Sequence, residues 1–263
     1  MTRILATYSI KGGVGKTTTA VNLAYLSAKD GARTLVWDLD PQGAATYLFR
    51  IKARVKGGGR DLVRGRNPAA GLVKGTDFDG LDLLPADLSY RHMDLHLDQA
   101  KRPTRRLGRV IAPLKREYDC IILDCPPSLS LVSESVFEAA AVVLVPMIPA
   151  PLPARTLDQL EAFLRADGKV AGPRSGGRQP DHRSRRDPRV LAFFTMVDRR
   201  RKLHRGIVEE LVGSRSDVLS TEIPVSTVYE QMGVHREPVE VFAAHSRAAE
   251  AYRALWQEVT SLI

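Results

Sequence analysis

One stretch, Lys11-Gly12-Gly13-Val14-Gly15-Lys16-Thr17-Thr18, constrains the fold of this chain more than any other feature. It follows an apolar run at residues 4–8 and precedes a helix-like segment at residues 18–29, which gives the order strand, glycine-rich turn, helix N-terminus. Free backbone N–H groups then converge on one point, and glycines let phosphate oxygens approach them without an intervening Cβ atom. Lys16 supplies positive charge for the β- and γ-phosphates, and the Thr17 hydroxyl is placed to bind Mg²⁺. The stretch therefore predicts a site for the phosphates of a nucleotide and for Mg²⁺.

The spacing departs from the strict P-loop pattern, which has a glycine six positions before the lysine, where this chain has Ile10. A second lysine, Lys11, stands directly before the double glycine. This Lys-Gly-Gly-x-Gly-Lys-Thr form resembles the deviant Walker A motif of the ParA/MinD family of ATPases. The resemblance implies that Lys11 and Lys16 both take part in ATP hydrolysis, with Lys11 reaching the phosphates of a partner subunit.

A second motif, Asp38-Leu39-Asp40-Pro41-Gln42-Gly43, follows the apolar run at residues 33–37. Carboxylates at the carboxyl end of a parallel strand face the ligand crevice of a doubly wound sheet, and alternation lets Asp38 and Asp40 point the same way. One acid can support Lys16 or the Mg²⁺ water shell and the other can orient the attacking water; the alternative is that both cap the next helix. The resemblance to ParA assigns the metal shell to Asp38 and catalysis to Asp40.

A third motif begins at Asp119, runs through the apolar residues 120–123 to Asp124, and continues as Cys125-Pro126-Pro127. It resembles a Walker B element, which implies that Asp124 holds a water of the Mg²⁺ shell. The two cysteines of the chain, Cys120 and Cys125, lie five positions apart on this strand and so point to opposite faces. We expect both to be buried thiols, without a disulfide, metal or iron–sulfur site.

Residues near the end of the chain are assigned to the nucleotide base by resemblance alone. A Met-x-Asp run after a late strand lies near the base in ParA-type relatives, which implies base contacts for Met196 and Asp198. A proline-containing turn lines the adenine pocket of those relatives, which implies the same for Pro224 and Val225.

The net charge of +9 indicates a polyanionic partner. Residues 165–205 hold thirteen Lys/Arg against four Asp, so the rest of the chain is close to neutral in sum and the basic character looks local. Within this stretch, phosphate backbones of DNA explain the basic cluster better than a solvated helix face does. The candidate DNA contacts are Arg199, Arg200, Arg201, Lys202 and Arg205, to which the resemblance of the late segment adds Arg236 and Arg247.

The remaining pattern predicts one α/β domain over residues 1–263, with a doubly wound, mostly parallel sheet and helices on both faces. Residues 167–188, rich in glycine and proline, are expected to form a flexible basic loop. Residues 51–75, with three successive glycines, look like a mobile surface connection whose basic residues serve solvation. No run reaches the ~18 apolar residues of a membrane span, and no signal peptide is visible, so we expect a cytoplasmic protein.

The resemblance covers nearly the whole chain. It implies a homodimer in the ATP state that binds DNA of the nucleoid without sequence preference, and whose hydrolysis a ParB-like partner stimulates to segregate a chromosome or plasmid. Two alternatives stay open, a ParA-like ATPase that positions a protein cargo and a MinD-like membrane-associated ATPase. The last segment, residues 246–263, places Tyr252, Leu255, Val259 and Leu262 on one face, which is more typical of core packing than of a membrane anchor.

Overall fold

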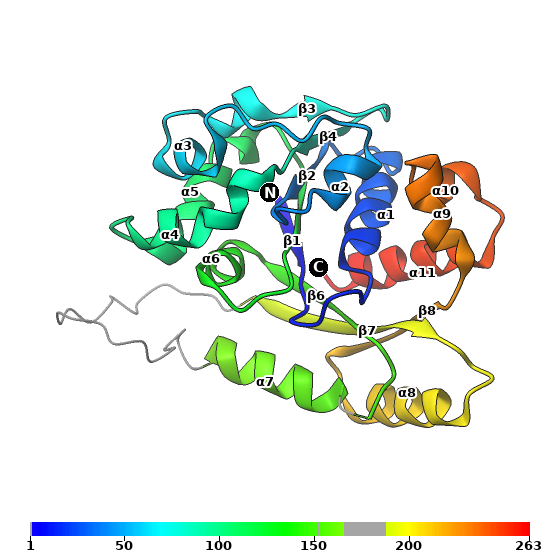
Figure 1. Cartoon of the computed structure of the whole chain (residues 1–263). Helices are drawn as coiled ribbons and strands as arrows, with labels where there is room; N and C mark the ends of the chain where they lie inside the picture. The colour runs from blue at the N-terminus through cyan, green and yellow to red at the C-terminus, as the bar shows by residue number, and fades with distance from the viewer. Residues whose placement is uncertain (1, 152, 166–187) are drawn as a thin grey trace.

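The chain forms one eight-stranded sheet in the order β3-β4-β2-β5-β1-β6-β7-β8 (Figure 1). The computed structural model describes all residues except 1, 152 and 166–187. β3 pairs antiparallel to β4 and the other neighbours are parallel, which confirms the predicted doubly wound sheet. The strands are β1 (Arg3–Thr7), β2 (Thr34–Asp38), β3 (Lys74–Gly75), β4 (Leu81–Leu84), β5 (Cys120–Asp124), β6 (Val142–Met147), β7 (Arg189–Val197) and β8 (Val218–Pro224).

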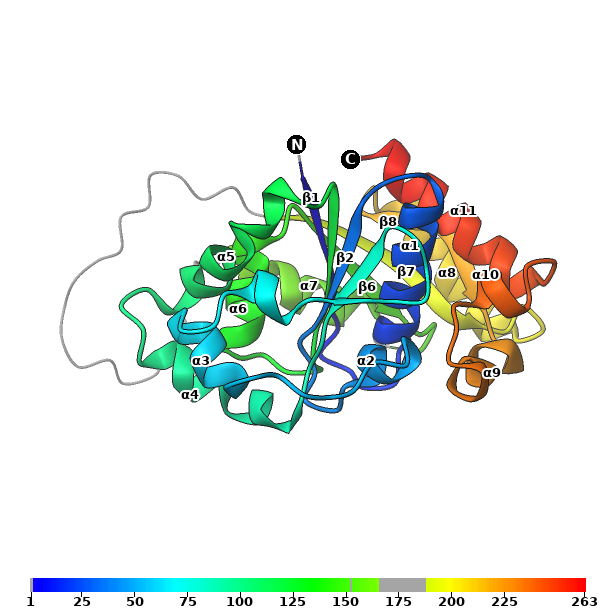
Figure 2. The ribbon, with the colours of Figure 1, turned by 90° about the horizontal axis from the view of Figure 1, so that it is seen from above.

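Helices cover both faces of this sheet (Figure 2). One apolar cluster joins one face to α3 (Gly58–Arg64), α4 (Met93–Asp98), α5 (Arg106–Ile111), α6 (Leu131–Ala139), α7 (Pro153–Arg165) and α8 (Lys202–Ser214). A second joins the other face to α1 (Lys16–Lys29), α2 (Ala44–Leu48), α9 (Thr227–His235), α10 (Val239–Phe242) and α11 (Arg247–Ser261). The central strands are buried on both sides, which explains their continuous apolar sequences.

Strand β1 lies at the topological switch point of the sheet. The chain leaves β1 toward β2, returns to β5 on the same side, and then continues to β6 on the other side. In open α/β sheets, ligands bind beyond the carboxyl ends of the strands at such a point. The glycine-rich turn after β1 and the acids that end β2 and β5 therefore meet at one edge of the sheet.

The segment at residues 51–75 is not the mobile connection that its glycines indicated. It contains α3, the 3-10 turn η1 (Ala69–Leu72) and β3, and α3 buries Leu62 and Val63. Gly58 has a φ of +62°, and a Cβ atom there would lie 2.7 Å from the Ser89 hydroxyl oxygen. The glycines are needed for close packing, so the prediction of a mobile loop was wrong.

Two other expectations for elements need adjustment. The last helix ends at Ser261, and Leu262 lies beyond it with 37% of its surface exposed, whereas Tyr252, Leu255 and Val259 are buried as predicted. The sequence of residues 86–116 is polar and helical in pattern, with a break at Pro103, and so predicts helix on both sides of that residue. The structure divides it between α4, α5 and three 3-10 turns, η2 (Leu88–His92), η3 (Pro103–Arg105) and η4 (Leu114–Arg116).

Several further expectations concern cysteines, membranes and the basic loop. Both cysteines are buried free thiols, as predicted. None of the helices in the part of the chain that the structure describes is long and apolar enough to cross a bilayer. The loop predicted over residues 167–188 lies outside the described residues, apart from Pro188.

Candidate nucleotide site

The glycine-rich turn between β1 and α1 has the open geometry of a phosphate cradle. Gly13 and Gly15 adopt left-handed φ values of +71° and +91°, which side chains rarely tolerate. A Cβ atom at Gly12 or Gly13 would meet nothing within 4 Å, so the concave side of the turn is free for a ligand. The turn is tied to β7 by Thr195, whose hydroxyl donates to the Val14 carbonyl at 2.9 Å.

Lys16 is almost buried at the start of α1, with 7% of its surface exposed. Its ammonium group donates to the carbonyl oxygen of Lys11 at 3.3 Å. Burial lowers the pKa of Lys16, and the nearby carboxylates of Asp124 and Asp40 oppose that change. The geometry therefore brings Lys16 together with two of the predicted acids, while Lys11 is exposed on the rim.

Asp124 and Asp38 end neighbouring strands in register and are both buried. Asp124 accepts a hydrogen bond from the Thr7 hydroxyl through Oδ1 at 3.3 Å, whereas its buried Oδ2 has no protein partner. Burial raises the pKa of Asp124 and the charge of Asp38 adds to the rise, while Thr17 and Lys16 lower it. An orphaned carboxylate oxygen beside a threonine hydroxyl is a suitable donor set for Mg²⁺ and its water shell.

Asp38 and Asp40 play different parts in the turn that follows β2. Asp38 accepts from both the backbone N–H and the hydroxyl of Thr46 in α2, at 2.8 and 2.7 Å, and from the Asp40 N–H at 3.2 Å. Asp38 thus holds the first turn of α2 from the end of β2, although the N-cap residue of that helix is Gly43. Asp40 is partly exposed, accepts from the Gln42 N–H at 2.9 Å, and lies near enough to Lys16 for its charge to act on the pKa of that lysine.

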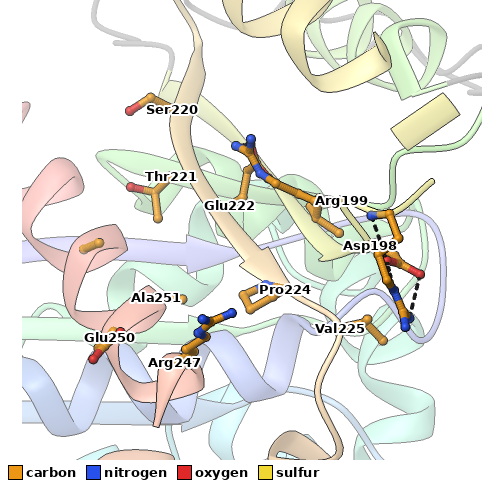
Figure 3. Close-up of a pocket in the computed structure, with 13 residues that line it drawn as sticks. Asp198, Arg199, Ser220, Thr221, Glu222, Pro224, Val225, Arg247, Glu250 and Ala251 are labelled. Atoms are coloured by element: carbon orange, nitrogen blue, oxygen red, sulfur yellow. Dashed lines mark hydrogen bonds and ion pairs between the residues drawn. The ribbon is translucent and has the colours of Figure 1, made fainter. Parts of the chain in front are cut away.

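A cavity of roughly 740 Å³ opens between the ends of β7 and β8 and the start of α11 (Figure 3). It brings three of the predicted base-side residues, Asp198, Pro224 and Val225, together with Arg199, Arg200 and Arg247, which were predicted to contact DNA. Met196, the fourth predicted base-side residue, is not in the cavity lining; its φ is +54° and 40% of its surface is exposed. The cavity and the glycine-rich turn are both in contact with the end of β7: Val197 lines the cavity, and the Thr195 hydroxyl donates to the Val14 carbonyl.

The basic cluster at the start of α8 is largely engaged by acids of the same chain. Arg199 pairs with Glu222 of β8, and Arg200 pairs with Asp198 at 2.9 Å. Arg201 lies 3.8 Å from Asp198, and these arginines hold the pKa of that carboxyl at about 2. Arg205 donates to the Arg199 carbonyl at 2.9 Å, and Lys202 is exposed. Much of the predicted DNA-binding charge is therefore compensated within the protein.

Arg236 and Arg247 differ in their surroundings. Arg236 lies with its guanidinium 4.4 Å from the centroid of the Tyr47 ring, and its Nε donates to the Tyr47 carbonyl at 2.9 Å. It therefore supports the C-terminal end of α2 while staying partly exposed. Arg247 is exposed as the first residue of α11.

Sequence reasoning missed Thr46 and Thr195, which hold Asp38 and the glycine-rich turn in place. Neither residue belongs to a recognisable motif, and Thr195 is 181 positions from its partner. Only the folded sheet shows that these hydroxyls support the site.

Comparisons with known proteins agree with this geometry. Residues 2–167 match the family described as AAA domain. The chain is 31% identical to the sporulation initiation inhibitor protein Soj of Bacillus subtilis, covering 99% of each chain. It is 29% identical to the chromosome partitioning protein ParA of Caulobacter vibrioides, covering 98% of this chain and 94% of the relative.

Two solved structures share the fold over nearly the whole chain. A putative plasmid partition protein from Borrelia burgdorferi, bound to AMPPNP, superposes with a TM-score of 0.82 at 20% identity and full coverage of both chains. Cobyrinic acid a,c-diamide synthase from Mycobacterium smegmatis, with an ATP analogue and magnesium, superposes with a TM-score of 0.80 at 25% identity, covering 99% of this chain and 94% of the other.

Proposed function

The chain belongs to the ParA and Soj family of P-loop ATPases, and from that premise we propose an ATP-driven, DNA-binding partition protein. In its ATP state it forms a homodimer, binds DNA of the nucleoid without sequence preference, and partitions a chromosome or plasmid. A ParB-like protein stimulates hydrolysis and so releases the dimer. The observation that carries the proposal is the orphaned Asp124 carboxylate oxygen beside Lys16, under an open glycine-rich turn.

The residues divide the work at the phosphates between them. Backbone N–H groups over residues 12–18, together with Lys16, hold the phosphates at the N-terminus of α1. Thr17 and Asp124 would hold Mg²⁺, and Asp38, in register with Asp124 on the neighbouring strand, would support its water shell. Asp40, which lies near Lys16 and is partly exposed to solvent, orients the attacking water. ATP supplies the phosphoryl group, and Mg²⁺ shields its charge when bound.

The cavity between β7, β8 and α11 receives the base in this proposal. Asp198, paired with Arg200, forms a polar part of the lining, while Pro224 and Val225 supply apolar surface from the end of β8. Met196 lies at the end of β7 next to this cavity and takes a flanking role. The arrangement fits an aromatic base with a polar edge.

Dimerisation follows from the charge of the bound nucleotides. Two nucleotide sites that face one another repel unless cations neutralise them, and Lys11 is an exposed cation at the rim of each site. Loss of the γ-phosphate removes part of the charge that Lys11 binds, so hydrolysis loosens the dimer. The proposed location is the cytoplasm, on the nucleoid.

We expect Lys11→Ala to bind a non-hydrolysable ATP analogue with an affinity within about threefold of wild type, which corresponds to less than 1 kcal/mol. The variant is expected to stay monomeric under conditions in which wild type dimerises, because the cation that crosses the interface is gone. Light scattering with and without the analogue measures this, and Lys52→Ala, an exposed lysine elsewhere, serves as the matched control. A Lys11→Ala variant that dimerises as wild type does would remove Lys11 from the interface.

The two alternatives concern what the ATPase acts on. A ParA-like ATPase that positions a protein cargo would have the same nucleotide site, so that site does not distinguish a protein cargo from DNA. A membrane-binding role needs a free apolar helix face, but α11 buries Tyr252, Leu255 and Val259 against the sheet. These observations argue against a membrane, and the net charge of +9 favours DNA as the proposed partner.

A further inference from the structure

A second basic surface lies on α3, η2 and α4, away from the cluster at the start of α8. Residues 51–116 contain fifteen Lys/Arg and seven Asp, with no Glu. The near neutrality of the chain outside residues 165–205 is therefore the sum of this basic segment and an acidic remainder. In both views of the ribbon, α3 and α4 lie on the opposite side of the molecule from α8 (Figures 1 and 2).

The exposed cations of this surface are uncompensated. Arg60 and Arg64 on α3, Arg91 on η2, and Lys101 with Arg102 after α4 are all exposed. Within the described residues none of these five forms an ion pair, in contrast to Arg199, Arg200 and Arg201 near α8. Their charge is thus available to a partner. We name this set, Arg60, Arg64, Arg91, Lys101 and Arg102, the α3–α4 basic face.

Hydrogen bonds fix the helices that carry the face. The Gly59 N–H donates to the Ser89 hydroxyl at 2.8 Å, which ties the start of α3 to η2. At the other end of α3, Arg64 donates to the Gln99 side-chain oxygen at 3.0 Å, just before Lys101. The backbone that carries these cations is therefore tied to its neighbours, so the spacing of the cations along the surface is set before a partner binds.

The neighbouring acids are directed elsewhere. Asp61 lies 3.6 Å from Arg66, and Asp94 accepts from the Val132 N–H of α6 at 2.9 Å. Asp87 accepts from the Val55 N–H and from Ser89. Asp98 remains exposed at the end of α4. Positive charges also lie close together on this surface. Burial lowers the pKa of His96, and the nearby Arg60, Arg64 and His92 lower it further.

We propose that the α3–α4 basic face is a second contact surface for the phosphate backbone of duplex DNA. This inference rests on the proposed function, because it adds a surface for the same partner. Each exposed cation that contacts a phosphate releases a condensed counter-ion from the DNA, and this release favours binding. Five cations without an acidic partner can therefore contribute to DNA affinity. Leu88 and Leu95 are exposed on the same helices, so an acidic protein is the competing partner, but single exposed leucines are ordinary on protein surfaces.

A salt series with a random-sequence duplex tests the face. For wild type and for Arg60→Gln/Arg64→Gln, binding is measured by fluorescence anisotropy in the presence of a non-hydrolysable ATP analogue. We expect the slope of log affinity against log salt to become shallower by about 1.8 in the double variant, or about 0.9 for each lost phosphate contact. Binding of the ATP analogue itself is expected to be unchanged and checks that the variant is folded.

The matched control is Lys115→Gln/Arg116→Gln, which removes the same charge from exposed residues of η4. Its slope is expected to equal that of wild type. An equal fall in both double variants would overturn the inference, because it would reflect net charge alone. Normal wild-type binding with an unchanged Arg60→Gln/Arg64→Gln slope would overturn it too and would point to an acidic protein. A wild-type chain that does not bind DNA in the ATP state would overturn the proposed function as well.

Discussion

Replacing Lys16 by alanine is expected to weaken ATP binding by at least about 100-fold, or roughly 2.7 kcal/mol. The ammonium group is almost buried and lies among Asp124, Asp40 and the Lys11 carbonyl, so it is already in position for the phosphates. A charge-assisted hydrogen bond to a phosphate in such a site contributes about twice as much as a neutral one. Isothermal titration with ATP and Mg²⁺ measures the loss.

Removal of a buried cation beside Asp124 can also disturb folding, so a second variant is needed. Lys16→Met keeps most of the length and the apolar stem of the side chain while removing the charge. We expect it to unfold at a temperature close to that of wild type and to show the same loss of affinity. Normal ATP affinity in a folded Lys16→Met variant would contradict the assignment of the phosphate site.

Replacing Asp40 by alanine is expected to lower ATP turnover by about 10²- to 10³-fold while leaving ATP affinity within about threefold of wild type. Asp40 is partly exposed and lies near Lys16, which suits a group that orients water. Asp38 is a weaker candidate for this task, because Thr46 and the Asp40 N–H occupy its oxygens. Phosphate release under single-turnover conditions measures the change.

Asp79→Ala is the control for this experiment, because it removes an exposed carboxylate elsewhere in the chain. Its turnover is expected to match that of wild type. If Asp40→Ala hydrolyses ATP at the wild-type rate, another acid orients the water, and the assignment carried over from the ParA resemblance fails for this chain.

The sheet and the phosphate site could be predicted because each depends on neighbouring residues. An apolar strand, a glycine-rich turn and the helix from Lys16 are consecutive in the chain, and strands ending in Asp38 or Asp124 carry their own signal. The parallel arrangement then follows from the alternation of strands and helices. The same local reasoning correctly placed Cys120 and Cys125 in the core.

Features that depend on distant partners could not be predicted. Glu222 neutralises Arg199 from the next strand, 23 positions away, so the basic run looks stronger in the sequence than it is in the fold. Gly58 looked like part of a loop because nothing in the sequence shows that Ser89 packs against it. The contact of Arg236 with Tyr47, 189 positions away, could not be predicted either, because it exists only in the folded chain.

The most direct test of the proposed function is binding to a random-sequence DNA duplex over a range of salt concentrations, in two nucleotide states. Wild type is measured with ADP, and Asp40→Ala is measured with ATP, which it is expected to bind without turnover. The account predicts tight binding only in the ATP state, falling steeply with salt as phosphate contacts are lost. Equal binding in both states, or binding in neither, would contradict DNA binding that depends on ATP. Lipid vesicles and candidate protein cargo would then be the partners to examine.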